Sequence, residues 1–169
     1  HTVTDDITIG ILTLNKVLIK DNGGVASENN WTLTATGPTN ISGAGAVGDT
    51  DVVSGPTFKA GTYTLAEAGG PTGYSASPWT CTNGVAVNGQ NQITLVNGKT
   101  TVCSITNDDI QPKLTLVKTV INDNSGDKVA DDFNLSVTKS TKVYVQSGVS
   151  TSFDADNYTV GEEQLDGYS

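Results

Sequence analysis

One strand-like segment occurs twice in this chain, and each copy carries a lysine on its apolar side. Residues 114–123 resemble residues 12–21 at an offset of 102 residues. Alternate residues of a strand share a face, so Lys16 and Lys118 each lie on a face that is otherwise built from leucine and valine. An unpaired ammonium is costly to bury, so we expect each lysine to be neutral or bonded to a partner.

The similarity between the two halves continues beyond these segments. Residues 132–138 resemble residues 30–36, and residues 158–162 resemble residues 63–67. Threonine, glycine and asparagine are abundant, which suits short strands and tight turns, and no segment has the pattern of an amphipathic helix. The sequence therefore predicts an all-β fold of two tandem Greek-key sandwich domains. The predicted boundaries are 11–109 for the complete domain, 110–113 for a linker and 114–169 for an incomplete second domain.

The second copy lacks the segments that close the first. Copy one continues with strand-like residues 76–82, 92–96 and 100–106, whereas copy two stops before their equivalents. Residues 1–10 resemble a closing strand, because residues 2–7 match the end of copy one. Two explanations stay open: the chain is part of a longer tandem array, or residues 1–10 complete the second domain of a neighbouring subunit by strand donation. Both make copies of the chain, or adjacent repeats, its partners.

Charge and hydropathy argue against several classes of partner. The net charge is −9, and all nine basic residues are lysines. An acidic chain without arginine is poorly suited to binding nucleic acid. No apolar run approaches the roughly 18 residues that a membrane span needs, so we expect no membrane insertion.

The two cysteines, Cys81 and Cys103, both lie in strand-like segments with apolar neighbours in alternation. A disulfide between them would close a loop of about 20 residues and contribute about 3 kcal/mol. Two buried thiols are the alternative. The disulfide would indicate an oxidising, extracellular setting.

Three polar residues of copy one fall at core-facing positions of three different strands. Lys16 lies on the first strand, Glu67 shares a face with Tyr63 and Leu65, and Asn107 lies on the last strand. First and last strands of a Greek-key sandwich can be neighbours, so Lys16 and Asn107 can meet.

The stretch from Tyr63 to Glu67, followed by Pro71 to Tyr74, resembles the glutamate motif of Cna B-type domains, the prealbumin-like sandwiches of bacterial surface adhesins and pilins. Lys16 matches the first-strand lysine of that family and Asn107 its last-strand asparagine. The resemblance implies a spontaneous isopeptide bond between these two side chains, assisted by Glu67. The chain departs from the family pattern after Asn107, where two aspartates follow.

The chemistry suits these residue types. Burial favours the neutral amine of Lys16, a nucleophile, while the carboxamide of Asn107 is the electrophile and loses ammonia. Glu67 can hydrogen-bond the carboxamide oxygen and carry protons. The alternative is a buried ion pair between Lys16 and Glu67 with Asn107 hydrogen-bonded nearby. The reaction would occur once, so the chain is not expected to be an enzyme.

Copy two has a lysine and a glutamate, Lys118 and Glu162, but no asparagine in the corresponding place. In the alignment Asp5 occupies the position of Asn107. We therefore predict an inter-domain or inter-subunit bond between Asp5 and Lys118, assisted by Glu162.

An oxygen-rich segment in copy two suggests a calcium site with Asp123, Asp127 and Asp131 as ligands. The same residue types are ordinary in turns, which is the alternative. No other cofactor is predicted, because the chain has a single histidine and no recognisable hydrolase motif.

Taken together, these patterns predict a structural repeat of a bacterial extracellular filament, pilus or adhesin stalk. The alternative is a ligand-binding module for carbohydrate, host protein or ice, which would need an exposed aromatic surface. Trp31 and Trp79 are the only indoles available for such a surface.

Overall fold

The computed structural model describes residues 10–46 and 52–169, which divide into two compact units. Unit 1 comprises residues 10–20 and 25–110, and unit 2 comprises residues 21–24 and 111–169. The described residues form strands and short 3-10 turns but no α-helix, so the all-β prediction is confirmed. No helix in the described ranges is long and apolar enough to cross a membrane.

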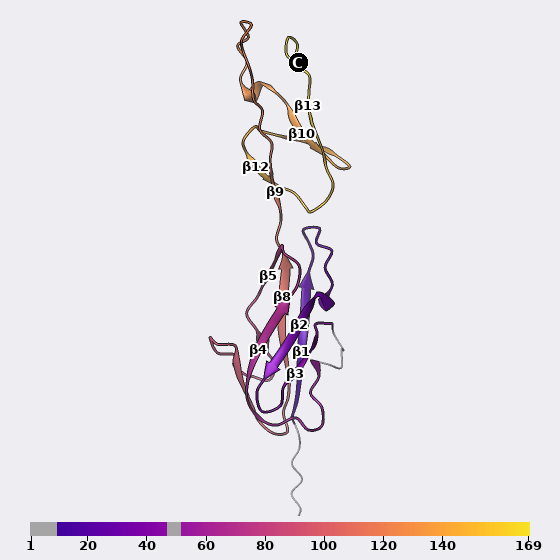
Figure 1. Ribbon diagram of the computed structural model, residues 1–169, viewed down its shortest axis with the longest axis vertical. Coiled ribbons are helices and arrows are strands. Elements are labelled where there is room, and N and C mark those ends of the chain that lie inside the picture. The colour runs from indigo at the N-terminus through magenta and orange to yellow at the C-terminus, as the bar shows by residue number, and fades with distance from the viewer. Residues whose placement is uncertain (1–9, 47–51) are drawn as a thin grey trace, which may run out of the picture. The chain divides into compact units, whose positions relative to one another are not determined.

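The first sheet of unit 1 is built around a parallel pair formed by its first and last strands. Its strands run in the order β1-β8-β5, and β6 also pairs with β8. They are β1 (Ile11–Ile19), β5 (Tyr74–Ala76), β6 (Thr80–Cys81) and β8 (Thr100–Asp109). Ile11 pairs with Thr100 and Ile19 with Asp108, so β1 is paired along its whole length (Figure 1).

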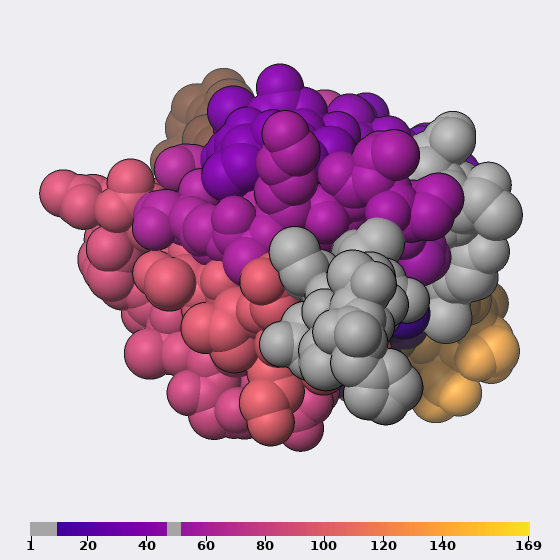
Figure 2. Space-filling view, turned by 90° about the horizontal axis from the view of Figure 1, so that it is seen from below, coloured from indigo at the N-terminus to yellow at the C-terminus, as the bar shows by residue number. Residues whose placement is uncertain are grey.

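The second sheet of unit 1 is antiparallel, in the order β3-β2-β4-β7. Its strands are β2 (Trp31–Thr36), β3 (Ile41–Ala44), β4 (Gly61–Gly69) and β7 (Gln92–Leu95). The 3-10 turn η1 (Glu28–Asn30) leads into β2. The loop between β6 and β7 projects from the body of unit 1 in both whole-molecule views (Figures 1 and 2).

The core of unit 1 consists of the inward side chains of both sheets. The alternation read from the sequence is visible in β1, where Leu12, Leu14 and Lys16 are buried and the residues between them are half-exposed. Leu33, Tyr63, Leu65, Ile93 and Ile105 are other members of this core.

The predicted disulfide is present between Cys81 and Cys103. These residues are direct partners in the antiparallel pairing of β6 with β8. Residues 76–82 do not form the single strand that the sequence predicts. The strand is interrupted from Ser77 to Trp79, around Pro78, because proline has no N–H to donate to a ladder.

Unit 2 repeats the early strands of unit 1. One sheet has the order β11-β10-β13, and β12 pairs with β9. The strands are β9 (Lys113–Thr115), β10 (Leu135–Thr138), β11 (Lys142–Val145), β12 (Ser150–Ser152) and β13 (Thr159–Glu162). The 3-10 turn η3 (Ala130–Asp132) precedes β10 as η1 precedes β2.

The repeat extends to individual contacts. Trp31 packs edge-on against Tyr74 with ring centres 5.4 Å apart, and Phe133 packs in the same way against Tyr168 at 5.3 Å. Each tyrosine hydroxyl accepts a hydrogen bond from a backbone N–H, that of Ala26 in unit 1 and that of Lys128 in unit 2, both at 3.1 Å. Trp31 and Phe133 keep the offset of 102 residues found in the sequence, as do Ala26 and Lys128, whereas Tyr74 and Tyr168 are equivalent at an offset of 94.

The structure differs from the sequence prediction in the first strand of unit 2. The alternating pattern predicts a strand through residue 120, but β9 ends at Thr115. The equivalent part of β1 is held by β8, and the described residues of unit 2 contain no counterpart of β8. A strand needs a neighbour to bond its backbone, so the pattern alone does not form one here.

Candidate functional site

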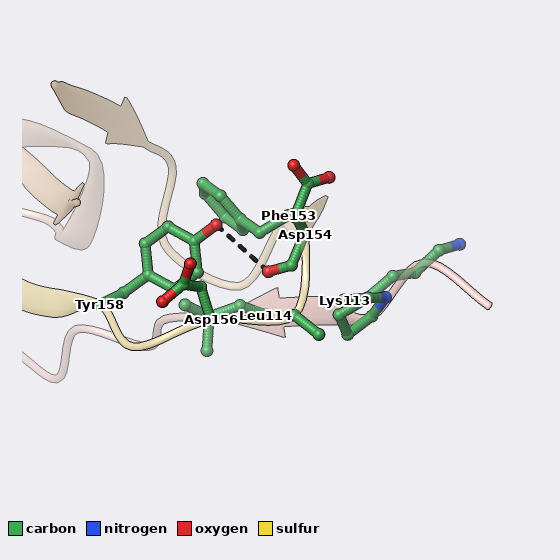
Figure 3. Close-up of a pocket in the computed structure, with 8 residues that line it drawn as sticks. Lys113, Leu114, Phe153, Asp154, Asp156 and Tyr158 are labelled. Carbon is green, nitrogen blue, oxygen red and sulfur yellow. Dashed lines mark hydrogen bonds between the residues drawn. The ribbon is translucent and has the colours of Figure 1, made fainter. Parts of the chain in front are cut away.

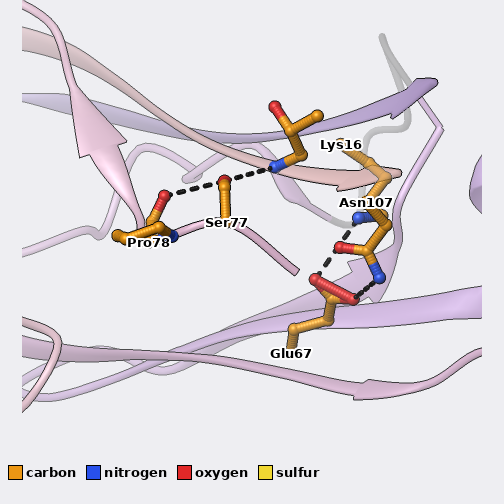
Figure 4. Close-up of polar contacts among 6 residues, drawn as sticks. Lys16, Glu67, Ser77, Pro78 and Asn107 are labelled. Atoms are coloured by element: carbon orange, nitrogen blue, oxygen red, sulfur yellow. Dashed lines mark hydrogen bonds and ion pairs between the residues drawn. The ribbon is translucent and has the colours of Figure 1, made fainter. Parts of the chain in front are cut away.

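Three polar side chains converge in the interior of unit 1, at the place the sequence predicts. Lys16 projects from β1, Asn107 from β8 and Glu67 from β4, so the site lies between the two sheets (Figure 4). The side chain of Lys16 is 0% exposed and that of Glu67 is 10% exposed. Asn107 is also buried.

The parallel register of β1 and β8 brings Lys16 and Asn107 together. Lys16 lies opposite Ile105, and Asn107 lies opposite Leu18. Residues of one strand that are two apart share a face, so the two polar side chains are diagonal neighbours on the inner face of the sheet.

Glu67 bridges the other two residues. Its Oε2 accepts a hydrogen bond from Nζ of Lys16 at 3.3 Å, and its Oε1 accepts one from Nδ2 of Asn107 at 2.8 Å. The carboxamide oxygen of Asn107 is buried and has no hydrogen-bond partner in the described part of the chain. The sequence pattern led us to expect a contact between Glu67 and this oxygen, whereas in the structure Glu67 contacts the carboxamide nitrogen.

Burial lowers the pKa of the Lys16 amine below its ordinary value of 10.5. The removal of water is the largest cause, because it disfavours the ammonium form. The negative charges of Glu67 and Glu28 act in the opposite direction without cancelling the effect. The environment thus makes the uncharged, nucleophilic form of the amine easier to reach than it is in an exposed lysine.

The backbone of β8 is bonded to Ser77 at the residue before Asn107. The backbone N–H of Thr106 donates to the hydroxyl of Ser77 at 3.0 Å, and the backbone N–H of Ser77 donates to the carbonyl of Thr106 at 2.8 Å. These bonds hold the backbone of β8 on the side away from β1.

Two contributors to the site were not identified from the sequence. Nζ of Lys16 lies 4.8 Å from the centre of the Trp31 ring, and Nζ of Lys118 lies 4.2 Å from that of Phe133. The signal was present in the repeat, which keeps an aromatic residue at this position in both copies. The second contributor is Gly45: a Cβ there would lie 2.8 Å from Cβ of Lys16 and 2.7 Å from the Glu28 carbonyl oxygen.

Unit 2 contains half of the same arrangement. Nζ of Lys118 donates to Oε1 of Glu162 at 2.8 Å, with side-chain exposures of 20% and 34%. Among the described residues no asparagine hydrogen-bonds to Glu162. Asp5 lies outside the described residues, so its bond to Lys118 stays a prediction.

The structure gives the suggested calcium site no geometric support. Among the described residues, no group of three carboxylates with its oxygens close together includes Asp123, Asp127 or Asp131. Asp127 pairs with Lys128 at 3.8 Å, and Asp123 accepts a hydrogen bond from Asn124.

Comparison with known proteins identifies the fold family of the chain. A model of the prealbumin-like fold domain matches the chain twice, at residues 8–105 and 109–169. The chain belongs to this family. Domains of this family occur in bacterial surface proteins, and the resemblance to Cna B-type domains is thereby confirmed at the level of fold.

The other comparisons add little to the family assignment. No curated protein is similar enough to count as a relative. Among solved structures, the Bacillus anthracis TIE protein matches with 16% sequence identity and a TM-score of 0.46. The match covers 92% of this chain but 26% of that protein, so the chain spans about a quarter of its length.

We expect Gly45→Ala to lower the free energy of unfolding of unit 1 by about 1–3 kcal/mol, because the added methyl group overlaps the Lys16 side chain and backbone that cannot easily move. Urea denaturation measures this change. Gly55→Ala is the matched control, since a Cβ at Gly55 has no heavy atom within 4 Å. Equal effects of the two substitutions would contradict the proposed close contact.

Because the pKa of Lys16 is lowered, we expect the free energy of unfolding to depend on pH in an Asn107→Leu variant, in which Lys16 cannot form the isopeptide bond. Between the lowered folded pKa and 10.5 the unfolded chain holds more protons on this lysine than the folded chain does. The free energy of unfolding should therefore rise with pH across that window, relative to a Lys16→Met, Asn107→Leu double variant. Parallel pH profiles for the two variants would show that the pKa is unchanged.

Proposed function

We propose that the chain is a load-bearing repeat of an extracellular bacterial filament, pilus or adhesin stalk, locked by an isopeptide bond between Lys16 and Asn107. The observation that carries the proposal is the buried triad, in which one glutamate contacts both the amine and the carboxamide. A lysine with a lowered pKa beside a carboxamide and a carboxylate is the combination that amide exchange requires.

The geometry supports a definite sequence of proton transfers. Lys16 gives a proton to Glu67, and the resulting amine attacks Cγ of Asn107. The new C–N bond forms as the bond from Cγ to Nδ2 breaks. Glu67, which already contacts Nδ2, passes the first proton and then a second proton from the attacking nitrogen to the departing nitrogen, which leaves as ammonium. Overall, an ammonium and a carboxamide give a secondary amide and an ammonium ion, and the Glu67 carboxylate is regenerated.

The mechanical consequence follows from the position of the bond. β1 and β8 are the first and last strands of unit 1, so a covalent link between them carries tension directly from one end of the unit to the other. About 90 residues lie between Lys16 and Asn107, and they would otherwise extend by about 300 Å under load. The disulfide between Cys81 and Cys103 attaches β6 to β8 as well.

In this proposal, the partners of the chain are copies of itself or adjacent repeats, and the protein acts at the bacterial cell surface. A ligand-binding module is the other candidate, but it has less support. Trp31 and Trp79, the residues that an aromatic binding surface would use, are only 3% and 5% exposed. Both pack inside unit 1, so neither offers a platform for a sugar ring or a peptide.

The intact mass of the purified chain should lie about 17 Da below the sequence mass, after about 2 Da is allowed for the disulfide, because one ammonia is lost. Lys16→Arg should abolish the deficit, since arginine remains protonated and does not attack the carboxamide. Glu67→Gln should abolish it too, because it keeps the shape of the side chain but cannot carry the proton. Lys118→Arg is the control that should retain it, and a wild-type mass without the deficit would refute the bond.

Single-molecule pulling on the two ends of unit 1 should show no unfolding step for residues 17–106 in the wild type. Lys16→Arg should restore an unfolding step, because β1 and β8 are then held only by non-covalent contacts. The disulfide must be reduced in both samples so that it does not mask the difference. Equal contour-length gains in the two proteins would contradict a load-bearing link.

A further inference from the structure

Among the described residues, Tyr144 is the only aromatic residue that is more than half exposed, at 56%. It lies on the outward face of the sheet β11-β10-β13, opposite Ser136 of β10, which pairs on its other side with Gly161 of β13. The register continues past the strand ends, so the next row of this face consists of Gln146, Asn134 and Glu163. The outward face of unit 2 therefore carries an aromatic ring, two amides and a carboxylate.

Unit 1 has only small side chains at the equivalent outward positions. These are Ser42, Thr34, Ala66, Ala44, Thr32 and Ala68. Most of them are exposed, although unit 1 contains the strands that follow β4. Exposure of this face is thus a property of the fold, and the two units differ in the chemistry that they present on it.

The ring of Tyr144 is held across the sheet. Its hydroxyl donates a hydrogen bond to Oε1 of Glu163, which directly follows β13. Because β10 lies between β11 and β13, the ring crosses the outward face of β10. Ser136 of β10 is accordingly 4% exposed, whereas its counterpart Thr34 in unit 1 is half-buried. One face of the ring is covered and its orientation is fixed, so little rotational freedom is lost when a ligand packs on the other face.

Polar groups surround the ring. Oε2 of Glu163 accepts a hydrogen bond from Nδ2 of Asn134 at 3.1 Å, and Nζ of Lys142 lies 3.8 Å from Oε1. The hydrogen bond from Tyr144 is the largest cause that lowers the pKa of Glu163, so this carboxylate accepts hydrogen bonds and does not donate them. The amide of Asn134 can both donate and accept.

The charges near the ring favour a neutral ligand. Lys142 offsets Glu163 and lies 5.8 Å from the ring centre, so a cationic ligand would meet a like charge. A hollow of about 210 Å³ beside the ring is lined in part by Asn134, Gln146 and Asp131. The carboxylate of Asp131 disfavours an anionic ligand there.

We propose that this outward face of unit 2 binds a neutral pyranose unit of a glycan, which stacks on Tyr144 and hydrogen-bonds to Asn134, Gln146 and Glu163. A pyranose has an apolar ring face that can pack on the exposed face of an aromatic ring. Its hydroxyl groups both donate and accept, which matches two amides and an ionised carboxylate.

The site is independent of the isopeptide bond proposed for unit 1. Tyr144 faces outward, whereas Glu162, the partner of Lys118, pairs with the buried Leu135 and lies on the opposite face of the sheet. One ring with a few polar neighbours supports weak binding, with a dissociation constant in the millimolar range. Several such units in one stalk would bind a repetitive glycan more tightly through avidity.

A second tyrosine of unit 2 provides an internal reference. Tyr158 lines a pocket of about 370 Å³ beside β9, and its hydroxyl donates to the Asp154 carbonyl (Figure 3). Leu114 and Phe153 also line this pocket. None of the described residues that line it is an asparagine or a glutamine. We therefore expect no sugar binding there.

The test is an NMR titration of the isotope-labelled full chain with methyl β-glucoside, methyl β-galactoside, methyl α-mannoside and chitotriose. At least one sugar should shift the side-chain amide signals of Asn134 and Gln146 in a saturable way. The signals of Leu114 and Tyr158 should stay in place. Tetralysine, titrated separately, should cause smaller shifts at Asn134 than the best sugar does.

Three variants test the role of the ring. Tyr144→Ser gives unit 2 the residue that unit 1 has at this position and should weaken binding by about tenfold or more. Tyr144→Phe keeps the ring but loses its bond to Glu163, so we expect a smaller loss. Val143→Ala alters the opposite face of the same strand and should leave binding unchanged. Unchanged signals of buried residues in each variant show that a loss of binding is not a loss of fold.

Four outcomes overturn the proposal. They are the absence of a saturable shift with all four sugars, equal effects of Tyr144→Ser and Val143→Ala, larger shifts with tetralysine than with any sugar, and sugar-induced shifts at Leu114 and Tyr158 instead of Asn134. The third outcome would assign the ring to cation binding, and the fourth would place the ligand in the pocket beside β9.

Discussion

The parallel pairing of β1 with β8 is the interaction on which the rest of unit 1 depends. It joins strands from opposite ends of the unit along the full length of β1, and its register places Lys16 and Asn107 diagonally on the inner face. The second sheet then supplies Glu67 from the other side of the core. Unit 2 shows the converse: without such a pairing in its described residues, the same apolar pattern forms a strand only as far as Thr115.

The buried triad explains why a lysine is tolerated in this core. A buried ion pair stabilises a fold only when its geometry offsets the loss of water around both charges, and the contact from Lys16 to Glu67 is 3.3 Å long. Conversion of the amine and carboxamide to a secondary amide would remove the positive charge from the interior. The energetic cost of burying Lys16 is thus a driving force for the proposed reaction as well as the condition for its nucleophilicity.

The two lysines occupy equivalent positions but different environments. The side chain of Lys16 is fully buried with a carboxamide near it, whereas that of Lys118 is one-fifth exposed and contacts a glutamate and an aromatic ring. Desolvation and a neighbouring electrophile are both needed for amide exchange, so sequence similarity at the lysine does not make the units equivalent in chemistry. Unit 1 brings the amine, the carboxylate and a carboxamide together, whereas the described residues of unit 2 bring together only the amine and the carboxylate.

The sequence by itself determined the all-β class, the repeat, the disulfide partners and the three members of the triad, because alternation and internal similarity act over a few neighbouring residues. Only the tertiary structure shows that Glu67 contacts the carboxamide nitrogen of Asn107 and that the Trp31 ring lies near the Lys16 amine. It also shows that Gly45 lies close against the Lys16 side chain. It also decided that the strand predicted through residue 120 stops at Thr115. Each of these depends on contacts between segments far apart in the chain, and local patterns carry no information about the distances across a core.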